Sequence, residues 1–305
     1  MAGLQKLHAQ QLPMLTQYML NDFAFNPAIA GTHDYYQVKN NVRIQWAGIE
    51  DAPRTYLLSV YGPHKTQPMG FGGYIYSDNA GKMSVNGLSL AYAYNIEAYQ
   101  DIRVSMGLFA GITQYRFKIS EIDYDPAMHY GMIDPVLSTA KDQAYIRPDA
   151  RLGIYAYTSQ YFFGYSANNL IPNKFVISEY DSIETDPGNR LKYHSYLMGG
   201  YKFMINRDFD LQPTVFFKHM GPAKPQVDIN AKVIYQKMVW LGLSFRTSDA
   251  VCMILGYNYN DLVHIGYSYD YTFSELSQFS NGTHEILIGV RFNNIKKTRS
   301  RRKIR

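Results

Sequence analysis

The 305-residue sequence lacks any run of apolar residues long enough to form a membrane-spanning helix. Such a helix needs about 18 or more consecutive apolar residues. The apolar residues here occur in short runs, and the mean hydropathy is only -0.28. This excludes a helical membrane protein. It leaves a membrane β-barrel open, because barrel strands alternate apolar with polar residues and so hide their hydrophobicity from averages.

Cysteine and the common catalytic motifs are scarce or missing as well. The single Cys252 excludes an internal disulfide framework. The sequence has no Gly-rich phosphate loop, no HExxH motif and no CxxC pair. His264 and Ser268 would share a strand face, but four strand residues separate them by ~13 Å, too far for a nucleophile and its base. We therefore expect no enzymatic activity, no cofactor and no metal site.

The formal charge of +5 is concentrated at one end of the chain. Residues Lys296 to Arg305 include seven Lys or Arg and no acid, which leaves 23 basic against 25 acidic residues elsewhere. A nucleic-acid-binding surface would be spread over a folded face. We therefore expect residues 294–305 to form a basic periplasmic tail, solvated or bound to a partner, and expect no nucleic acid.

The N-terminal region divides into two expected parts. Leu7-His8-Ala9 resembles the small-residue end of a secretory signal peptide, so residues 1–9 are interpreted as its remnant. Residues 10–37 are too apolar for a free tail, as Leu15 and Phe23 illustrate. They are expected to form an ordered periplasmic segment ahead of a barrel that spans residues 38–293.

Alternation with a period of two recurs from about Val38 onward. In the segment from His284 to Phe292, the even positions are apolar after His284, whereas the odd positions include Glu285 and Arg291. Successive side chains of a strand point to opposite faces. A basic residue facing lipid at mid-membrane costs roughly 2–4 kcal/mol. The charged face is therefore expected to point into a lumen, and this last strand to close the barrel against the strand near 38–46.

Fourteen such segments are expected. They lie near 38–46, 55–61, 70–77, 86–95, 102–117, 144–157, 161–168, 193–204, 210–219, 226–235, 238–246, 251–258, 262–272 and 284–293. Tight turns such as Gln236-Lys237 and Asn260-Asp261 alternate with longer connections at about 118–143, 169–192, 219–225 and 273–283. Outer-membrane barrels combine short periplasmic turns with long external loops. The predicted fold is all-β: a transmembrane antiparallel up-and-down β-barrel of about 14 strands, in the outer membrane of a Gram-negative bacterium, with both termini periplasmic. A soluble β-sandwich, the alternative, rarely needs so many strands in one domain.

The lumen of a barrel of this size must be partly filled by side chains or loops. The lumen-facing charges Arg246, Asp270, Glu285 and Arg291 are therefore expected to pair across a packed interior, and lining a selective channel is the alternative.

Several segments resemble the PorP/SprF family of type IX secretion system membrane proteins. They are Gln17-Tyr18-Met19-Leu20-Asn21, Asn26-Pro27-Ala28-Ile29-Ala30-Gly31, Arg43-Ile44-Gln45-Trp46-Ala47-Gly48-Ile49, Ala52-Pro53-Arg54-Thr55, Gly70-Phe71-Gly72-Gly73-Tyr74-Ile75, Trp240-Leu241-Gly242-Leu243-Ser244-Phe245-Arg246, Ile265-Gly266-Tyr267-Ser268-Tyr269-Asp270 and His284-Glu285-Ile286. The chain departs from the family pattern at Glu50-Asp51, where the family tends to have Gly. The candidate site residues, structural or partner-contacting, are Gln17, Tyr18, Asn21, Asn26, Pro27, Gly31, Arg43, Gln45, Trp46, Gly48, Pro53, Trp240, Arg246, Asp270, His284 and Glu285.

The resemblance implies a non-enzymatic outer-membrane component of type IX secretion. Its partners would be outer-membrane lipid, a cargo C-terminal domain or surface adhesin such as a gliding adhesin, the secretion translocon, and the periplasmic ring lipoprotein complex. Cargo is expected at the loops 118–143, 169–192 and 273–283. The alternative function is a passive porin or small-molecule outer-membrane transporter.

Overall fold

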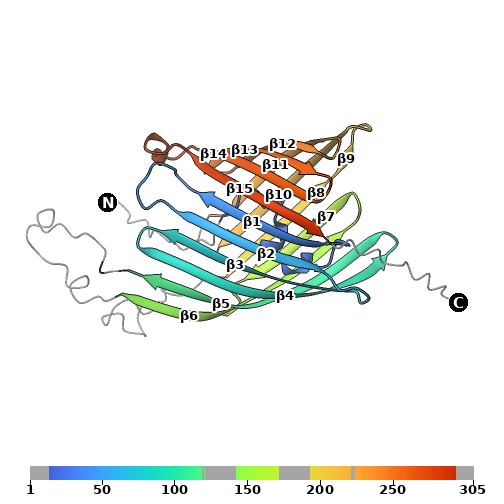
Figure 1. The fold of residues 1–305 in the computed structure, drawn as a ribbon, viewed down its shortest axis with the longest axis horizontal. Coiled ribbons are helices and arrows are strands. Elements are labelled where there is room, and N and C mark those ends of the chain that lie inside the picture. The colour runs from blue at the N-terminus through green and yellow to red at the C-terminus, as the bar shows by residue number, and fades with distance from the viewer. Residues whose placement is uncertain (1–13, 119, 121–141, 172–192, 221–223, 293–305) are drawn as a thin grey trace, which may run out of the picture.

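The chain forms a closed antiparallel β-barrel in a computed structural model, which describes residues 14–118, 120, 142–171, 193–220 and 224–292 (Figure 1). Its strands are β1 (Tyr36–Ile44), β2 (Arg54–Pro63), β3 (Met69–Ala80), β4 (Met83–Tyr99), β5 (Ile102–Phe117), β6 (Gln143–Tyr157), β7 (Tyr161–Asn168), β8 (His194–Tyr201), β9 (Phe203–Met204), β10 (Phe209–Met220), β11 (Gln226–Tyr235), β12 (Val239–Arg246), β13 (Ala250–Tyr259), β14 (Val263–Thr272) and β15 (Thr283–Phe292). Three short 3-10 turns accompany them, η1 (Asp22–Ala24), η2 (Pro27–Ile29) and η5 (Glu275–Gln278).

The barrel has fourteen strands because β8 and β9 together occupy one position beside β10. The interruption between them lies opposite Pro213 in β10, where Leu211 pairs with Phe203 and Thr214 pairs with Gly200. Proline has no N–H to donate to a ladder, so a gap in pairing is expected at this point. The predicted strand at 193–204 is therefore confirmed, with a break in its middle.

The first and last strands close the barrel. β1 pairs with β15 from Tyr36, opposite Phe292, to Ile44, opposite His284, and every remaining neighbour in the sheet is consecutive along the chain. Figure 1 shows the same closure, with the blue β1 lying between the red β15 and β2. Closure pairs the backbone groups that a free sheet edge would leave unsatisfied in lipid.

The barrel is apolar outside and polar inside. Outward side chains such as Leu90 and Leu243 are 66% and 59% exposed, whereas Asn41, Ser268 and Glu285 on the inner face are fully buried. This is the reverse of a soluble protein and fits a wall that faces lipid. The faces predicted for β12, β14 and β15 are confirmed by their burial patterns. In the described part of the chain, no helix is long and apolar enough to cross a membrane.

The two ends of the barrel differ. At one end, here called the short-turn mouth, Gln236-Lys237 and Asn260-Asp261 have positive φ angles of 48–59°. Consecutive residues with such angles form the primed turns that join twisted antiparallel strands. The other end, the long-loop mouth, carries the connections at 45–53, 118–142, 169–193 and 273–282, and β15 ends at the short-turn mouth.

Candidate functional site

The described part of the N-terminal segment lies inside the barrel. Residues Met14–Gly31, here called the plug, include Leu15, Phe23 and Ala28, each at most 3% exposed. The plug starts beside the long-loop ends of β1, β12, β14 and β15. It ends where Gly31 meets Gly70 near the start of β3, at the short-turn mouth. From there the chain turns into β1.

This path corrects the expectation for residues 10–37. An ordered segment was predicted ahead of the barrel on the periplasmic side, but residues 14–31 occupy the lumen. They do so because their apolar and polar side chains both find partners on the inner wall. Met14 and Phe292 lie at opposite mouths, so the segment does not enter the barrel at the mouth where β15 ends. The two termini themselves lie outside the described residues.

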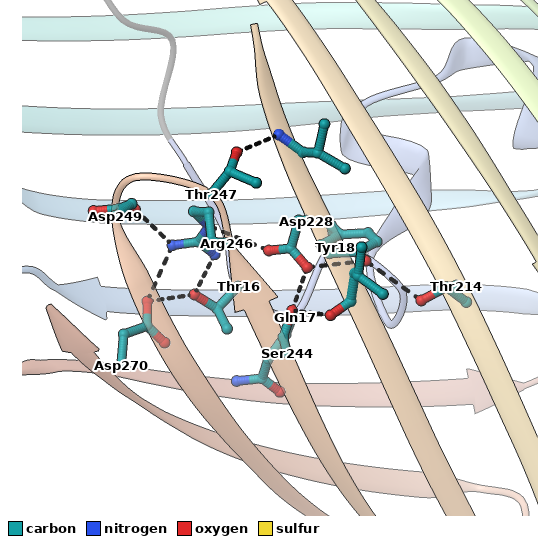
Figure 2. Close-up of polar contacts among 12 residues, drawn as sticks. Thr16, Gln17, Tyr18, Thr214, Asp228, Ser244, Arg246, Thr247, Asp249 and Asp270 are labelled. Atoms are coloured by element: carbon teal, nitrogen blue, oxygen red, sulfur yellow. Dashed lines mark hydrogen bonds and ion pairs between the residues drawn. The ribbon is translucent and has the colours of Figure 1, made fainter. Parts of the chain in front are cut away.

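The start of the plug sits in a cluster of mostly buried polar and charged side chains, here called the mouth network: Thr16, Arg43, Asp228, Arg246, Asp249, Asp270 and Glu285 (Figure 2 shows most of it). The Thr16 hydroxyl donates to Asp270 Oδ2 at 2.6 Å and accepts from Arg43 at 2.8 Å and from Arg246 at 3.1 Å. The Thr16 amide donates to Glu285 Oε2 at 2.7 Å. One plug residue therefore bridges two wall arginines and two wall carboxylates.

The arginines also pair directly with the carboxylates. Arg43 lies 2.9 Å from Asp270 and 3.3 Å from Glu285. Arg246 lies 3.2 Å from Asp228 and 3.4 Å from Asp270. All five side chains are at most 4% exposed. These pairs join wall residues to one another, and removing one partner of a buried ion pair leaves an uncompensated charge. The network therefore fixes in place the wall groups to which Thr16 is hydrogen-bonded.

The next plug residues continue the polar contacts. Gln17 donates from Nε2 to the Glu285 carbonyl at 3.0 Å, and the Tyr18 hydroxyl lies 3.4 Å from Asp228. Asn21 donates to Asn41 Oδ1 at 2.7 Å, and Asn41 in turn donates to Glu285 at 3.0 Å. The plug and the wall thus share one continuous hydrogen-bonded chain.

The second half of the plug, around η2, packs closely against the inner wall. Asn26 caps η2 by accepting from the Ala28 amide at 3.0 Å, and its Nδ2 donates to the Ile154 carbonyl at 3.1 Å. Pro27 occupies the first position of that turn, where its missing N–H costs nothing. Gly107 of β5 lies directly beneath: a Cβ there would be 2.4 Å from the Ala28 amide nitrogen. Glycine is thus required for the wall to approach this closely.

Replacing Gly107 with valine is expected to destabilise the plugged barrel by roughly 1–3 kcal/mol, the usual cost of overpacking. The midpoint of urea unfolding in lipid vesicles, followed by tryptophan fluorescence, measures the change. Gly199→Val is the matched control, because a Cβ there would lie 3.6 Å from the nearest atom. Equal midpoints for the two variants would contradict the close packing of the plug.

Ten of the predicted site residues meet in the plug and on the wall that holds it. They are Gln17, Tyr18, Asn21, Asn26, Pro27, Gly31, Arg43, Arg246, Asp270 and Glu285. The expected pairing of Arg246, Asp270 and Glu285 in a packed interior is confirmed, and Arg291 lies 3.8 Å from Asp261 at the short-turn mouth.

The other six predicted residues lie elsewhere. Gln45, Trp46, Gly48 and Pro53 lie in the β1–β2 loop. The Trp46 amide donates to the Thr283 hydroxyl at the start of β15 at 3.1 Å, and the Ala47 amide donates to the Gly282 carbonyl of the β14–β15 loop at 2.8 Å. β1 ends at Ile44, before Trp46, whose φ is +50°. Trp240 lines the lumen near the short-turn mouth. His284 points outward, with its Nδ1 2.7 Å from the Tyr267 hydroxyl.

Sequence reasoning missed Thr16, Asn41, Asp228 and Asp249. Asn41 and Asp228 occupy inward positions of predicted strands, so alternation could have identified them as lumen-facing. Thr16 and Asp249 lie outside strands; the carboxylate partners of Thr16 are more than 200 residues away, and Asp249 pairs with Arg246 at the end of β12. The expected cargo loops 118–143 and 169–192 lie largely outside the described residues.

A family model described as type IX secretion system membrane protein PorP/SprF matches residues 7–290 of the chain. No curated protein sequence matches the chain. Among solved structures, the toluene transporter TbuX of Ralstonia pickettii is similar, with a TM-score of 0.53, 9% identity, and coverage of 88% of this chain and 92% of TbuX. The outer membrane protein Omp33 of Acinetobacter baumannii matches with a TM-score of 0.46 and 6% identity over 85% of this chain and 98% of Omp33. At such identity the likeness to TbuX concerns the barrel fold alone.

Proposed function

The chain belongs to the PorP/SprF family of type IX secretion system membrane proteins, and from this membership we propose that it is an integral outer-membrane docking component. In this role the long-loop mouth holds a specific secreted cargo, such as a surface adhesin, through the cargo's C-terminal domain. The short-turn mouth faces the periplasm and meets the ring lipoprotein complex. The protein performs no covalent chemistry.

The observation that carries the proposal is the plug. A conduit for a folded or unfolded passenger needs an open lumen, whereas this lumen holds residues 14–31, whose Thr16 is hydrogen-bonded to buried, ion-paired residues of the wall. The space left beside Leu15 and Tyr18 at the long-loop mouth is only about 10 Å³. A barrel obstructed in this way can present its mouths as surfaces, so docking is favoured over conduction.

The β14–β15 loop offers an apolar surface for a partner. Around η5, Phe279 is 74% exposed and Leu276 is 39% exposed at the long-loop mouth. Both lie beyond Thr272, where the strand ends. Large exposed apolar and aromatic side chains rimmed by polar residues are typical of interaction sites. This loop is therefore our choice for the cargo contact among the described residues.

The orientation rests on the lengths of the connections. In bacterial barrels the short turns face the periplasm and the longer loops face outward. The short-turn mouth, where β15 ends, is accordingly the side that we assign to the ring complex.

The test is an affinity pull-down of a tagged chain from detergent-solubilised membranes. A large surface protein is expected to co-purify, and the double variant Leu276→Ser with Phe279→Ser is expected to lose most of it. Leu262→Ser, at an exposed position of a short turn, is the matched control and should retain the partner. If deletion of the gene leaves all type IX cargo secreted and attached to the surface, the proposal is wrong.

A further inference from the structure

A second space in the barrel lies on the other side of the plug, open toward the short-turn mouth. This lower cavity has a volume of about 430 Å³ and runs between the plug and the walls from β6 to β15 and β1. Its size lies within the usual range of small-molecule sites, roughly 300–1,000 Å³. None of the mouth-network residues lines this cavity.

The cavity carries an excess of positive charge. Its lining includes five basic residues, Lys39, Lys202, Lys232, Lys237 and Arg291, and three acids, Asp22, Asp210 and Asp261. Lys202 pairs with Asp210 at 3.0 Å and Arg291 with Asp261 at 3.8 Å, which leaves three lysines facing Asp22. Burial lowers the pKa of the lining His33 to about 4, so at neutral pH this imidazole adds no charge.

Three polar side chains project from neighbouring positions on β10, β11 and β12. Lys232 pairs across the sheet with Gln212, and Trp240 pairs with Ile234, two residues along from Lys232 on the same face. All of them line the cavity. The lysine and the tryptophan are buried, at 7% and 6% exposure. The nitrogen edge of the Trp240 ring lies over Gly256 of β13, so the two neighbouring donors on this part of the wall are the Lys232 ammonium and the Gln212 amide.

These donors lack acceptors within the protein. The Lys39 ammonium is satisfied by the Leu20 carbonyl and the Tyr61 hydroxyl. Among the residues that the structure describes, Lys232 makes no hydrogen bond and no ion pair within 4 Å, and the Trp240 Nε1 has no acceptor. The Lys232 ammonium therefore has no acceptor in the described protein and faces a cavity that is open at the short-turn mouth, where a charged acceptor on a ligand can reach it.

We propose that Lys232 and Gln212 bind the carboxylate of a small organic acid that enters from the short-turn mouth. The carboxylate accepts from the ammonium and from the amide, and charge-assisted bonds of this kind are the strong ones. The body of the acid lies against Met19 and Leu20 of the plug and Ile234 of the wall, which line the same cavity. No bond is formed or broken. The site is independent of the docking role.

The probe is 4-fluorobenzoate, and binding is followed by ¹⁹F NMR with the full chain in lipid nanodiscs. Saturable binding is expected, and Lys232→Met should weaken it by about tenfold or more, as for loss of a hydrogen bond to a charged group. Lys237→Met removes a charge from the exposed rim of the cavity and should change the affinity by less than about twofold, as expected for a solvent-screened charge. The neutral analogue 4-fluorobenzamide should bind at least about tenfold more weakly than the acid.

Gln212→Leu provides a second variant that keeps the lysine and removes the amide donor. It should weaken the acid several-fold while the barrel keeps its heat-modifiable migration on gels, which also serves as the folding check for Lys232→Met. The proposal is overturned if 4-fluorobenzoate does not bind saturably, if the amide binds as well as the acid, or if folded Lys232→Met binds like the parent chain.

Discussion

Replacing Arg43 with methionine is expected to destabilise the plugged barrel by roughly 3–5 kcal/mol, the cost of leaving buried charges unpaired. Arg43 is the only side chain that contacts Thr16, Asp270 and Glu285 together in the described structure. Methionine retains most of the aliphatic length, so the loss is mainly electrostatic. The free energy of unfolding from urea titration in lipid vesicles measures the effect.

The control for this variant is Arg103→Met at the opposite mouth. Arg103 pairs with Glu97 at 3.3 Å, but Glu97 is largely exposed. An exposed ion pair contributes at most about 1 kcal/mol. A loss of stability no larger in Arg43→Met than in Arg103→Met would contradict the role that we assign to the mouth network. Adding Glu285→Gln to Arg43→Met should recover part of the loss, because among the described residues Glu285 has its ion pair with Arg43, whereas Asp270 keeps its pair with Arg246.

Deleting residues 14–31 is expected to convert a poorly conducting barrel into an open channel. Fourteen strands enclose a lumen that the strand side chains alone do not fill, and the plug fills much of it here. In planar lipid bilayers the single-channel conductance of the deletion variant should exceed that of the parent chain by at least about tenfold. This result separates docking from the porin alternative.

The control variant keeps the plug and all of its contacts with the wall. Gly199→Val, whose side chain would lie on the outer face beside the exposed Phe163, should conduct as little as the parent chain. If the parent chain already conducts like the deletion variant, the plug does not close the barrel, and a passive porin becomes the better function.

The strands could be predicted from the sequence because alternation is a local property. Ile286, Ile288 and Val290 read as one face from the sequence alone, and the structure places them outward. The tight turn at Asn260-Asp261 could be predicted for the same reason, since residues that tolerate positive φ mark such turns. The closure of the barrel by its first and last strands could be predicted from these two local features.

The plug could not be predicted in this way. Its backbone is irregular apart from two 3-10 turns, so it has no period from which a face could be read. Thr16 has its partners more than 200 positions away at Asp270 and Glu285. The apolar residues Leu15 and Phe23 indicated only that the segment is ordered. A segment packed in the lumen and one packed on a periplasmic surface would both be ordered. The family resemblance selected Gln17, Tyr18 and Asn21 without saying what they contact.

The lower cavity could not be predicted from the sequence either. Gln212 and Lys232 belong to different strands, and only the pairing of β10 with β11 places them side by side. Alternation is consistent with an inward position for each of them. Whether the lysine has a partner depends on the three-dimensional structure and cannot be read from the sequence. Sequence patterns therefore predicted the wall of this barrel and left its contents to the structure.

Cysteine accessibility tests most directly whether the plug occupies the lumen. In a Cys252→Ser background, which removes the native cysteine, Ala24→Cys and Phe279→Cys each provide one thiol, at positions that are 7% and 74% exposed. A membrane-impermeant maleimide applied to protein in lipid vesicles should label Phe279→Cys rapidly. It should label Ala24→Cys only after unfolding in urea with detergent. Labelling of folded Ala24→Cys at the rate of Phe279→Cys would place the segment outside the barrel and contradict the plugged structure on which the docking role depends.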